Sequence, residues 1–337
     1  MKVGIINVTG YAGMELARIL WQHPNVTVVA ATGRSLVGQK LGEAFPHLAG
    51  YDLTITEEVK DADLIFSALP SAASAEACAP WVRQGVPVID IAADFRLKDP
   101  GAFEHWYGQP HPAPDLLEQS VYGLPELHQK QIARSQVVAN PGCYPTPAIL
   151  ALAPAYTEGL INDNIVVDAK SGISGAGRGS GSSYGYGEVN ESVSAYRVEG
   201  HAHLPEITQE LGVLRGGRPP GLTFVPHLVP MTRGILTTCY APLTRPVTRA
   251  EVRSLYQKFY SATPFTRVVD YSPATKYTLG NNMCLVYPTI DERTNTLIAI
   301  GVIDNLVKGA AGQAVQNMNL MCGFPEKTSL EALAVYP

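Results

Sequence analysis

The chain has 337 residues, more than a single hydrophobic core usually accommodates, so we expect two domains; its 46% hydrophobic and 16% charged residues are typical of a well-buried globular protein. The formal net charge is −5 and no basic run stands out, which disfavours nucleic acid or an anionic membrane surface as a partner. No apolar run reaches the roughly 18 residues of a membrane-spanning helix.

Two further features predict the compartment. The N-terminus, "MKVGIINV", leads directly into a strand pattern without a cleavage-site signature, so we expect no signal peptide. The cysteines are odd in number, widely scattered and without the spacing of zinc ligands: Cys78, Cys143, Cys239, Cys284 and Cys322. We therefore expect a reduced, cytoplasmic protein without a metal site.

The first part of the chain alternates predicted strands with predicted helices. The helix at 13–23 has its apolar side chains mostly on one side, and an alanine-rich helix at 71–84 is opened by Ser71. This alternation predicts βαβ units and therefore an α/β, Rossmann-type domain with a parallel sheet. Its strands are expected at 2–8, 26–32, 62–69 and 87–92.

The pattern changes after Cys143. Strands are no longer each followed by a helix, and two of them flank the turn "DERTN" as a hairpin. A helix at 248–263 carries a capping box made by Thr248 and Glu251. These features predict an α+β domain with a largely antiparallel sheet, whose strands are expected at 164–172, 222–227, 234–243, 282–290 and 296–304.

Two segments have a biased composition. The last helix, 305–323, is rich in small residues on one side, which suits tight packing against another element. The segment 171–187 is too rich in glycine to form regular structure. It is either a flexible loop or a loop whose bare backbone approaches a ligand.

A glycine-containing turn follows the first predicted strand, in "GIINVTGYAG". Gly10 permits a tight turn close to a pyrophosphate, and Gly13 permits close packing of helix and strand. The helix N-terminus then offers free N–H groups to the anion. We expect the turn to bind a dinucleotide through Thr9, Gly10, Tyr11, Ala12 and Gly13; the alternative is a plain strand–helix turn.

The end of the second strand indicates which dinucleotide. NAD-binding folds usually place Asp or Glu there to accept a hydrogen bond from the ribose 2′-hydroxyl. This chain has "ATGRS" instead, and Arg34 with Ser35 suits a 2′-phosphate. The sequence therefore favours NADP(H), unless Arg34 is merely a solvated loop arginine.

Cys143, in "NPGCYPT", has the surroundings of a nucleophile. Thr146 is expected to cap a helix and Pro147 to be its first residue, so that Cys143 lies just ahead of a helix N-terminus, at the carboxyl end of a strand. The helix dipole there favours the thiolate. The other cysteines lie inside apolar patterns, where a cysteine is usually a small buried hydrophobe.

The segment "HAHLPEI" supplies candidate bases. His203 lies at the N-terminus of a helix opened by Pro205 and Glu206, where positive potential favours a neutral imidazole that can accept a proton. Glu206 could orient that ring, and His201 is the alternative base. A thiolate, a proton-transfer histidine and a nicotinamide together predict reduction of an acyl group through a thioester, with release of an aldehyde.

The motifs closely resemble those of the N-acetyl-γ-glutamyl-phosphate reductase family. They run in order along nearly the whole chain: "GYAG", "DIAADFRL", "YGLPEL", "NPGCYPT", "SGISGAGR", "HAHLPEI", "PHLVPMTRGIL" and "DNLVKGAAGQAVQNMN". The aspartate-semialdehyde dehydrogenases share the architecture and chemistry of this family but not this set of motifs. Three positions depart from the family pattern: Asn7 replaces Gly or Ala, Ala92 replaces Ser, and Ala202 replaces Arg or Lys.

The resemblance implies a role for each matching residue. Cys143 is the nucleophile, His203 the acid/base and Glu206 the acidic residue of the histidine motif. Substrate binding falls to Arg96, at the phosphate, and to His201, Ser171 and Ser174. Gly172, Gly175, Gly177 and Asn305 complete the cofactor site. The resemblance also implies a discontinuous NADP-binding domain, 1–142 with 306–337, and a catalytic and dimerisation domain, 143–305.

The resemblance implies an enzyme of arginine biosynthesis. It would reduce N-acetyl-γ-glutamyl phosphate with NADPH to N-acetylglutamate 5-semialdehyde, as a homodimer or homotetramer. One alternative is a reductase of a carrier-protein-linked aminoadipyl or glutamyl phosphate, although no basic cluster for docking a carrier is evident. Another is a catalytically silent NADP-binding protein, which the presence of Cys143 and both histidines disfavours.

Overall fold

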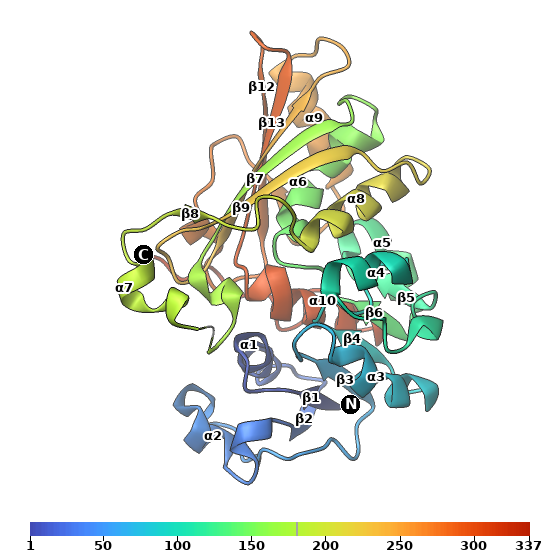
Figure 1. The fold of residues 1–337 in the computed structure, drawn as a ribbon, viewed down its shortest axis with the longest axis vertical. Helices are drawn as coiled ribbons and strands as arrows, with labels where there is room; N and C mark the ends of the chain where they lie inside the picture. Colours follow the sequence, from blue (N-terminus) through green and yellow to red (C-terminus); the bar gives the residue numbers. More distant parts are fainter. Residues whose placement is uncertain (180) are drawn as a thin grey trace. The chain divides into compact units, whose positions relative to one another are not determined.

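In the computed structural model, which describes residues 1–179 and 181–337, the chain forms two units. Ser180, within the glycine-rich segment 171–187, lies outside the described residues. Unit 1 comprises Met1–Gly142 and Ala310–Ala332, and unit 2 comprises Cys143–Gly309 and Leu333–Pro337. Figure 1 labels the elements of both units.

Unit 1 is built on a six-stranded parallel sheet with the strand order β2-β1-β3-β4-β6-β5. Because β2 and β3 lie on opposite sides of β1, the chain reverses its direction across the sheet at β1. The carboxyl ends of the strands at such a switch point are where open α/β sheets bind ligands. The strands are β1 (Lys2–Ile6), β2 (Thr27–Ala31), β3 (Leu64–Ser67), β4 (Val88–Asp90), β5 (Ser120–Tyr122) and β6 (Val137–Ala139).

The helices of unit 1 cover this sheet. The crossovers β1–α1–β2 and β3–α3–β4 run in opposite directions along the sheet. Because such crossovers are right-handed, they place α1 and α3 on opposite faces. The C-terminal helix α10 packs on α1 and α5. The α-helices are α1 (Tyr11–Leu20), α2 (Leu41–Ala44), α3 (Ser74–Arg83), α4 (Pro100–Tyr107), α5 (Pro125–Ile132) and α10 (Gly312–Met321); the 3₁₀ helices are η1 (Arg34–Leu36), η2 (Pro46–Leu48) and η3 (Pro114–Leu116).

Unit 2 is built on a seven-stranded mixed sheet with the order β11-β12-β13-β10-β7-β9-β8. Most neighbours are antiparallel; β11 with β12 and β7 with β9 are parallel. The predicted hairpin is confirmed as β12 and β13, paired from Leu285 with Val302 to Asp291 with Thr296. The strands are β7 (Asn164–Ser171), β8 (Ser194–Ala195), β9 (Gly221–Leu228), β10 (Ile235–Pro242), β11 (Thr266–Val268), β12 (Cys284–Asp291) and β13 (Thr296–Ile303).

Three helices pack on one face of this sheet. The central one, α6, contacts β10, β12 and β13 and is buried from Pro145 to Tyr156, which explains its almost entirely apolar sequence. The predicted capping box of α9, Thr248 with Glu251, is confirmed. The α-helices are α6 (Pro145–Thr157), α7 (Tyr186–Val189), α8 (His203–Leu214) and α9 (Arg249–Phe259); the short 3₁₀ helices are η4 (Ile173–Ala176), η5 (Ser182–Tyr184) and η6 (Thr275–Thr278).

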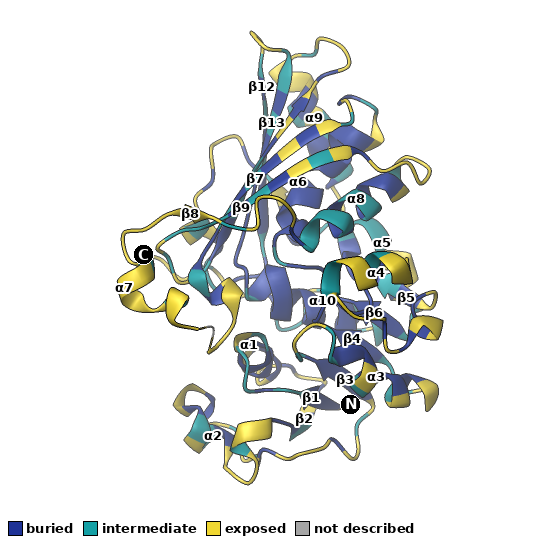
Figure 2. Cartoon of the chain, viewed as in Figure 1, coloured by how far each residue is buried: buried dark blue, intermediate teal, exposed yellow. Residues whose placement is uncertain are grey.

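The other face of the seven-stranded sheet is partly exposed. Along β7 and β10, buried residues alternate with less buried ones, and Figure 2 shows this alternation on β7. Val166 and Tyr240 on this face are 41% and 38% exposed. The fold thus confirms the predicted pair of architectures, a parallel Rossmann-type sheet and a largely antiparallel sheet, and leaves one face of the unit 2 sheet partly in contact with solvent.

Candidate active site

Cys143 opens unit 2, immediately before α6. The prediction that Thr146 caps this helix is wrong: α6 begins at Pro145, with Tyr144 at the N-cap. Pro145 and Pro147 both fit the first turn, whose N–H groups have no partner within the helix. The Cys143 side chain is half-buried. Two other cysteines have raised pKa values because they are buried: the pKa of Cys239 is about 12 and that of Cys322 about 11. Those two thiols stay protonated at neutral pH.

The two histidines lie at the start of α8. His203 is its first residue, and its backbone N–H donates to Nδ1 of His201 at 3.0 Å. Burial, helped by Arg197, lowers the pKa of His201 to about 4, so its imidazole is neutral at pH 7. Because Nδ1 accepts a hydrogen bond, the ring proton is on Nε2. Glu206, three residues after His203 and on the same side of the helix, is 1% exposed.

An aromatic cluster joins the nucleophile turn to these histidines. The Tyr144 ring lies 5.9 Å from the ring of His203 and 6.1 Å from that of His201, and the two imidazoles are 4.7 Å apart. The structure thus brings Cys143 and the histidine pair together through the residue next to the nucleophile. Sequence reasoning missed Tyr144; an aromatic residue directly after a candidate nucleophile was the available signal.

The predicted glycine-rich loop is tied to the end of β13. The Asn305 side chain accepts a hydrogen bond from Gly234 N at 2.7 Å and donates one to Ser174 Oγ at 2.9 Å. Gly172 leaves no room for a side chain, because a Cβ there would lie 2.8 Å from the backbone of Thr232 and Arg233. Unit 2 therefore gathers six of the predicted site residues in one place: Ser171, Gly172, Ser174, Gly175, Gly177 and Asn305.

The segment after β13 differs from the prediction of one continuous helix. It begins with a π-helical turn, η7 (Val307–Ala311), closed by the bond from Gly309 N to Asp304 O at 3.0 Å. Asp304 is fully buried, pairs with Arg233 at 3.0 Å, and also accepts from Gly280 N and Leu306 N. The turn presses Gly309 against Cys143: a Cβ on Gly309 would lie 3.0 Å from Cys143 Cβ.

The phosphate-binding turn predicted in unit 1 has an open helix N-terminus. Gly10 is the N-cap of α1 and offers no side chain to its N–H groups. Gly13 is required, because a Cβ there would lie 2.4 Å from Asn7 O. Asn7 adopts φ +66°, a conformation that Asn tolerates, and its side chain donates to Ala68 O and accepts from Thr9 Oγ1. The departure at Asn7 therefore fits the turn.

Three other predicted residues of unit 1, Arg34, Ser35 and Arg96, lie at the carboxyl edge of its sheet. Arg34 and Ser35 follow β2 and are exposed. Arg96 is 7% exposed, and its guanidinium donates to Asn140 O and Ile91 O, both at 2.8 Å, just beyond the ends of β6 and β4.

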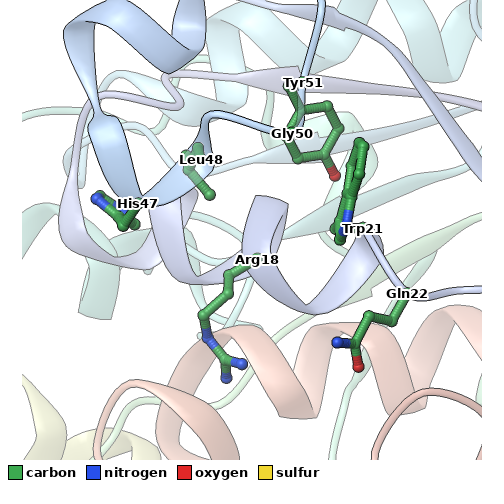
Figure 3. A pocket seen from close by; sticks show the side chains of 7 residues that line it. All are labelled: Arg18, Trp21, Gln22, His47, Leu48, Gly50 and Tyr51. Atoms are coloured by element: carbon green, nitrogen blue, oxygen red, sulfur yellow. The ribbon is translucent and has the colours of Figure 1, made fainter.

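Unit 1 also contains a pocket of about 110 Å³ at the opposite, C-terminal end of α1 (Figure 3). Trp21 and Tyr51 meet there edge to face, with ring centres 4.8 Å apart. Its other lining residues are Arg18, Gln22, His47, Leu48 and Gly50. Because the phosphate-binding turn precedes the first residue of α1, this pocket is separate from that turn.

No helix within residues 1–179 and 181–337 is long and apolar enough to cross a membrane. Within the same residues, no group of three or more His, Cys, Asp and Glu side chains could hold a metal ion.

Known proteins resemble both units. A family model described as the NAD binding domain of semialdehyde dehydrogenase matches residues 2–135, and one described as the semialdehyde dehydrogenase dimerisation domain matches 143–305. Among solved structures, aspartate semialdehyde dehydrogenase II of Vibrio cholerae superimposes with a TM-score of 0.74 at 17% identity, covering 96% of this chain and 98% of that one. The Candida albicans aspartate semialdehyde dehydrogenase with NADP gives 0.71 at 14% identity, covering 97% and 98%. These likenesses show the fold.

Relatives of higher identity match over the full length. A Dehalococcoides mccartyi protein named N-acetyl-gamma-glutamyl-phosphate reductase is 54% identical over 337 residues, covering all of this chain and 99% of the relative. A Pelotomaculum thermopropionicum protein of the same name is 47% identical over 346 residues, again covering 100% and 99%. The chain therefore belongs to the N-acetyl-gamma-glutamyl-phosphate reductase family of semialdehyde dehydrogenases.

Proposed function

We propose that the protein reduces N-acetyl-γ-glutamyl phosphate to N-acetylglutamate 5-semialdehyde, using NADPH and releasing phosphate, as a step of arginine biosynthesis. One observation carries the choice of substrate: the full-length identity of 54% to a relative named for this reaction. The chemistry is supported by the cluster in unit 2, where a half-buried cysteine at a helix N-terminus is linked by Tyr144 to a histidine pair. The relatives do not favour a carrier-linked substrate.

Cys143 acts as the nucleophile. Its thiolate attacks the acyl carbon of the substrate; a C–S bond forms, the C–O bond to phosphate breaks, and inorganic phosphate leaves. NADPH, when bound, would supply a hydride to the acyl carbon of the thioester. The resulting thiohemiacetal oxygen takes a proton from His203, which later removes that proton as the C–S bond breaks. The aldehyde is released and the thiolate of Cys143 is restored.

The two histidines have different roles in this proposal. His201 accepts a hydrogen bond at Nδ1 and stays neutral, so it offers Nε2–H to the substrate as a fixed donor. His203, at the helix start, is the acid/base, and Glu206 on the same side of α8 orients the site. Ser171 and Ser174 complete the substrate contacts of unit 2.

We assign the pyrophosphate and the 2′-phosphate of the cofactor to unit 1. The uncapped N-terminus of α1 and the bare Gly10 and Gly13 fit a pyrophosphate, which would lie on Thr9–Gly13. Gly172, Gly175, Gly177 and Asn305 would line the nicotinamide end. The exposed Arg34 and Ser35 would hold the 2′-phosphate; Arg34→Leu should therefore lower the preference for NADP⁺ over NAD⁺ by about tenfold or more.

Arg96 is the proposed ligand of the substrate phosphate. Its two bonds to backbone carbonyls fix the guanidinium plane at the carboxyl ends of β4 and β6, the edge of a parallel sheet at which ligands bind. A fixed guanidinium binds phosphate with little loss of side-chain entropy.

We assign NADP binding to residues 1–142 with 306–337, and catalysis and dimerisation to residues 143–305.

We further propose that the protein is a homo-oligomer. It would assemble as a dimer through the exposed face of the seven-stranded sheet, or as a tetramer made of two such dimers. The face offers Val166 on β7, Tyr240 on β10 and the half-buried Ile298 on β13, which are in register across the sheet, and Ile300 lies on the same face two residues after Ile298. A second copy would bury these apolar side chains.

The free thiols of all five cysteines suit the reducing cytoplasm.

The reaction can be tested in reverse. Purified protein is given N-acetylglutamate 5-semialdehyde, phosphate, and either NADP⁺ or NAD⁺, and reduced nicotinamide is followed by absorbance. The proposal predicts activity that requires phosphate and prefers NADP⁺. If the folded protein does not oxidise this aldehyde but oxidises a carrier-linked semialdehyde, the proposed substrate is wrong. Activity that does not require phosphate would contradict the acyl-phosphate chemistry.

A further inference from the structure

Tyr144 has an unusual place for a bulky aromatic residue. It follows the nucleophile directly and is the N-cap of α6, yet its side chain makes no capping hydrogen bond, and the residue is only 2% exposed. Capping α6 therefore does not explain this side chain. Tyrosine is also a poor choice at an N-cap, where Ser, Thr, Asp and Asn are preferred.

The hydroxyl group of Tyr144 is held from two sides. It donates a hydrogen bond to the backbone oxygen of His227 on β9 at 3.1 Å, and it accepts one from the hydroxyl of Tyr196 at 3.1 Å. Burial, with Tyr196 and Cys143 nearby, raises the pKa of Tyr144 far above its usual value. The phenol therefore stays neutral and keeps its proton on the bond to His227, so it is not an acid or base of the reaction.

The ring of Tyr144 contacts both histidines of the site. It meets His201 at an angle of 80° and His203 at 64°, both edge to face. Phe224 packs against the same ring with centroids 5.5 Å apart, and it also packs against His201 at 5.4 Å. Edge-to-face pairs at these distances have a preferred geometry, so a fixed Tyr144 ring restricts the orientation of its neighbours.

We propose that Tyr144 is a positioning residue for the reaction: its ring, anchored through its hydroxyl, holds the imidazoles of His201 and His203 beside the nucleophile turn. The kinetic consequence rests on the proposed function. Because Tyr144 is joined to Cys143 by a peptide bond, one side chain sets the distance between the nucleophile and the proton-transfer group. Tyr144 acts through the histidines and leaves formation of the thiolate to the helix N-terminus.

Two variants separate the ring from its anchor. Tyr144→Leu removes the ring, and kcat is expected to fall about 10- to 100-fold with KM little changed, as for a small misplacement of a catalytic group. Tyr144→Phe keeps the ring but loses the hydroxyl bonds to His227 and Tyr196, and a smaller fall is expected. Iodoacetamide should alkylate Cys143 of both variants within about twofold of the wild-type rate, because the thiolate does not depend on the ring.

Tyr156→Leu is the matched control. Tyr156 is a fully buried tyrosine of the same helix, about 18 Å further along, whose hydroxyl lies 3.3 Å from both Asp163 Oδ1 and Arg218 O. It should cost stability while kcat per folded molecule stays at the wild-type value. An equal loss of kcat in both leucine variants would show a general packing effect and overturn the proposal, as would a parallel loss of alkylation in Tyr144→Leu.

A second readout does not need activity. NMR titration of labelled histidines should show His201 titrating at higher pH in Tyr144→Leu than in wild type, because the lost ring admits water to the imidazole. The Tyr156→Leu variant should leave the titration unchanged. Unchanged titrations of His201 and His203 in Tyr144→Leu would overturn the proposal even in an inactive enzyme. An inactive wild type would overturn the proposed function alone.

Discussion

At the scale of single residues, His201 makes the protein sensitive to acid. Its pKa is about 4 in the folded protein because of burial, against an ordinary value of 6.5. As the pH falls below about 6.5, the unfolded chain binds a proton that the folded one does not, so stability is lost between about 6.5 and 4. His201→Asn should remove on the order of 3 kcal/mol of this acid-induced loss of unfolding free energy.

Urea unfolding across this pH range checks the sign and size of the effect. His47→Asn is a suitable control, since His47 is an exposed histidine of unit 1. Parallel stability curves for wild type and His201→Asn would show that His201 does not carry the acid sensitivity.

The sequence pointed to the proposed reactive residues but not to the residues that contact and position them. Cys143, His201 and His203 stand in short patterns with a chemical meaning, and the structure places all three in unit 2 around one tyrosine ring. Gly309 carries no such pattern, and the local signal for Tyr144 is only that an aromatic residue follows a candidate nucleophile. Their importance depends on contacts between segments that are far apart along the chain, which a reading of local spacing does not reveal.

At the scale of elements, the π-helical turn η7 brings its backbone against Cys143, the proposed nucleophile. Gly309→Ala would put a methyl group 3.0 Å from Cys143 Cβ and 3.1 Å from Ile303 Cδ1, so Cys143 must shift by a few tenths of an ångström. We expect kcat to fall about tenfold or more, because small displacements of a nucleophile are costly. The change in stability should stay within about 1–3 kcal/mol.

Gly221→Ala provides the control for this prediction. Its new Cβ would meet only Asp163 O at 3.4 Å and Asn164 Oδ1 at 3.8 Å, which are ordinary contacts. A Gly309→Ala enzyme with wild-type kcat would mean that the turn tolerates a side chain beside Cys143.

The junction of β3, β4 and α3 buries a carboxyl group. Asp90 is fully buried; Ser74 Oγ donates to its Oδ1 at 2.5 Å and Ala92 N donates at 3.0 Å. Burial and the nearby Asp94 raise the pKa of Asp90 to about 7. Between pH values of about 4 and 7 the folded protein holds a proton that the unfolded chain has lost, so the stability contributed by Asp90 falls as the pH rises.

Asp90→Asn should therefore be more stable than wild type at neutral pH, by a few kcal/mol at most, and should flatten this part of the stability curve. Thermal unfolding at several pH values measures it, with Asp115→Asn, an exposed acid of the same unit, as control. A variant less stable than wild type at every pH would show that the ionised carboxylate is the stabilising form.

The elements differ in how well the sequence predicts them. Long apolar runs correctly predicted the central strands of both sheets, and the spacing of Thr248 and Glu251 correctly predicted the capping box of α9. Helix starts were less secure: α3 begins at Ser74 and not at Ser71, and α6 at Pro145 and not at Pro147. In both cases several residues could start the helix, and tertiary contacts such as Asp94 with the N–H of Ser74 decided the outcome.

At the scale of the whole molecule, assembly should depend on the exposed face of the unit 2 sheet. Tyr240→Asp would place an unpaired charge in the proposed interface, twice if the dimer is two-fold symmetric. We expect the molar mass in solution, measured by light scattering, to fall to that of a smaller assembly. Tyr186→Asp, which alters a tyrosine that is 80% exposed on α7, should leave the mass unchanged. A mass unaffected by Tyr240→Asp would exclude this face.

The central claim is that Cys143 carries the acyl group. To measure this directly, the enzyme is mixed rapidly with N-acetylglutamate 5-semialdehyde and NADP⁺ in the absence of phosphate, and the formation of NADPH is followed over time. Without phosphate to release the thioester, we predict a burst approaching one NADPH per chain, with the acyl group located on Cys143 by mass spectrometry and no burst in Cys143→Ser. A burst that survives in Cys143→Ser, or an acyl group on another residue, would contradict the account.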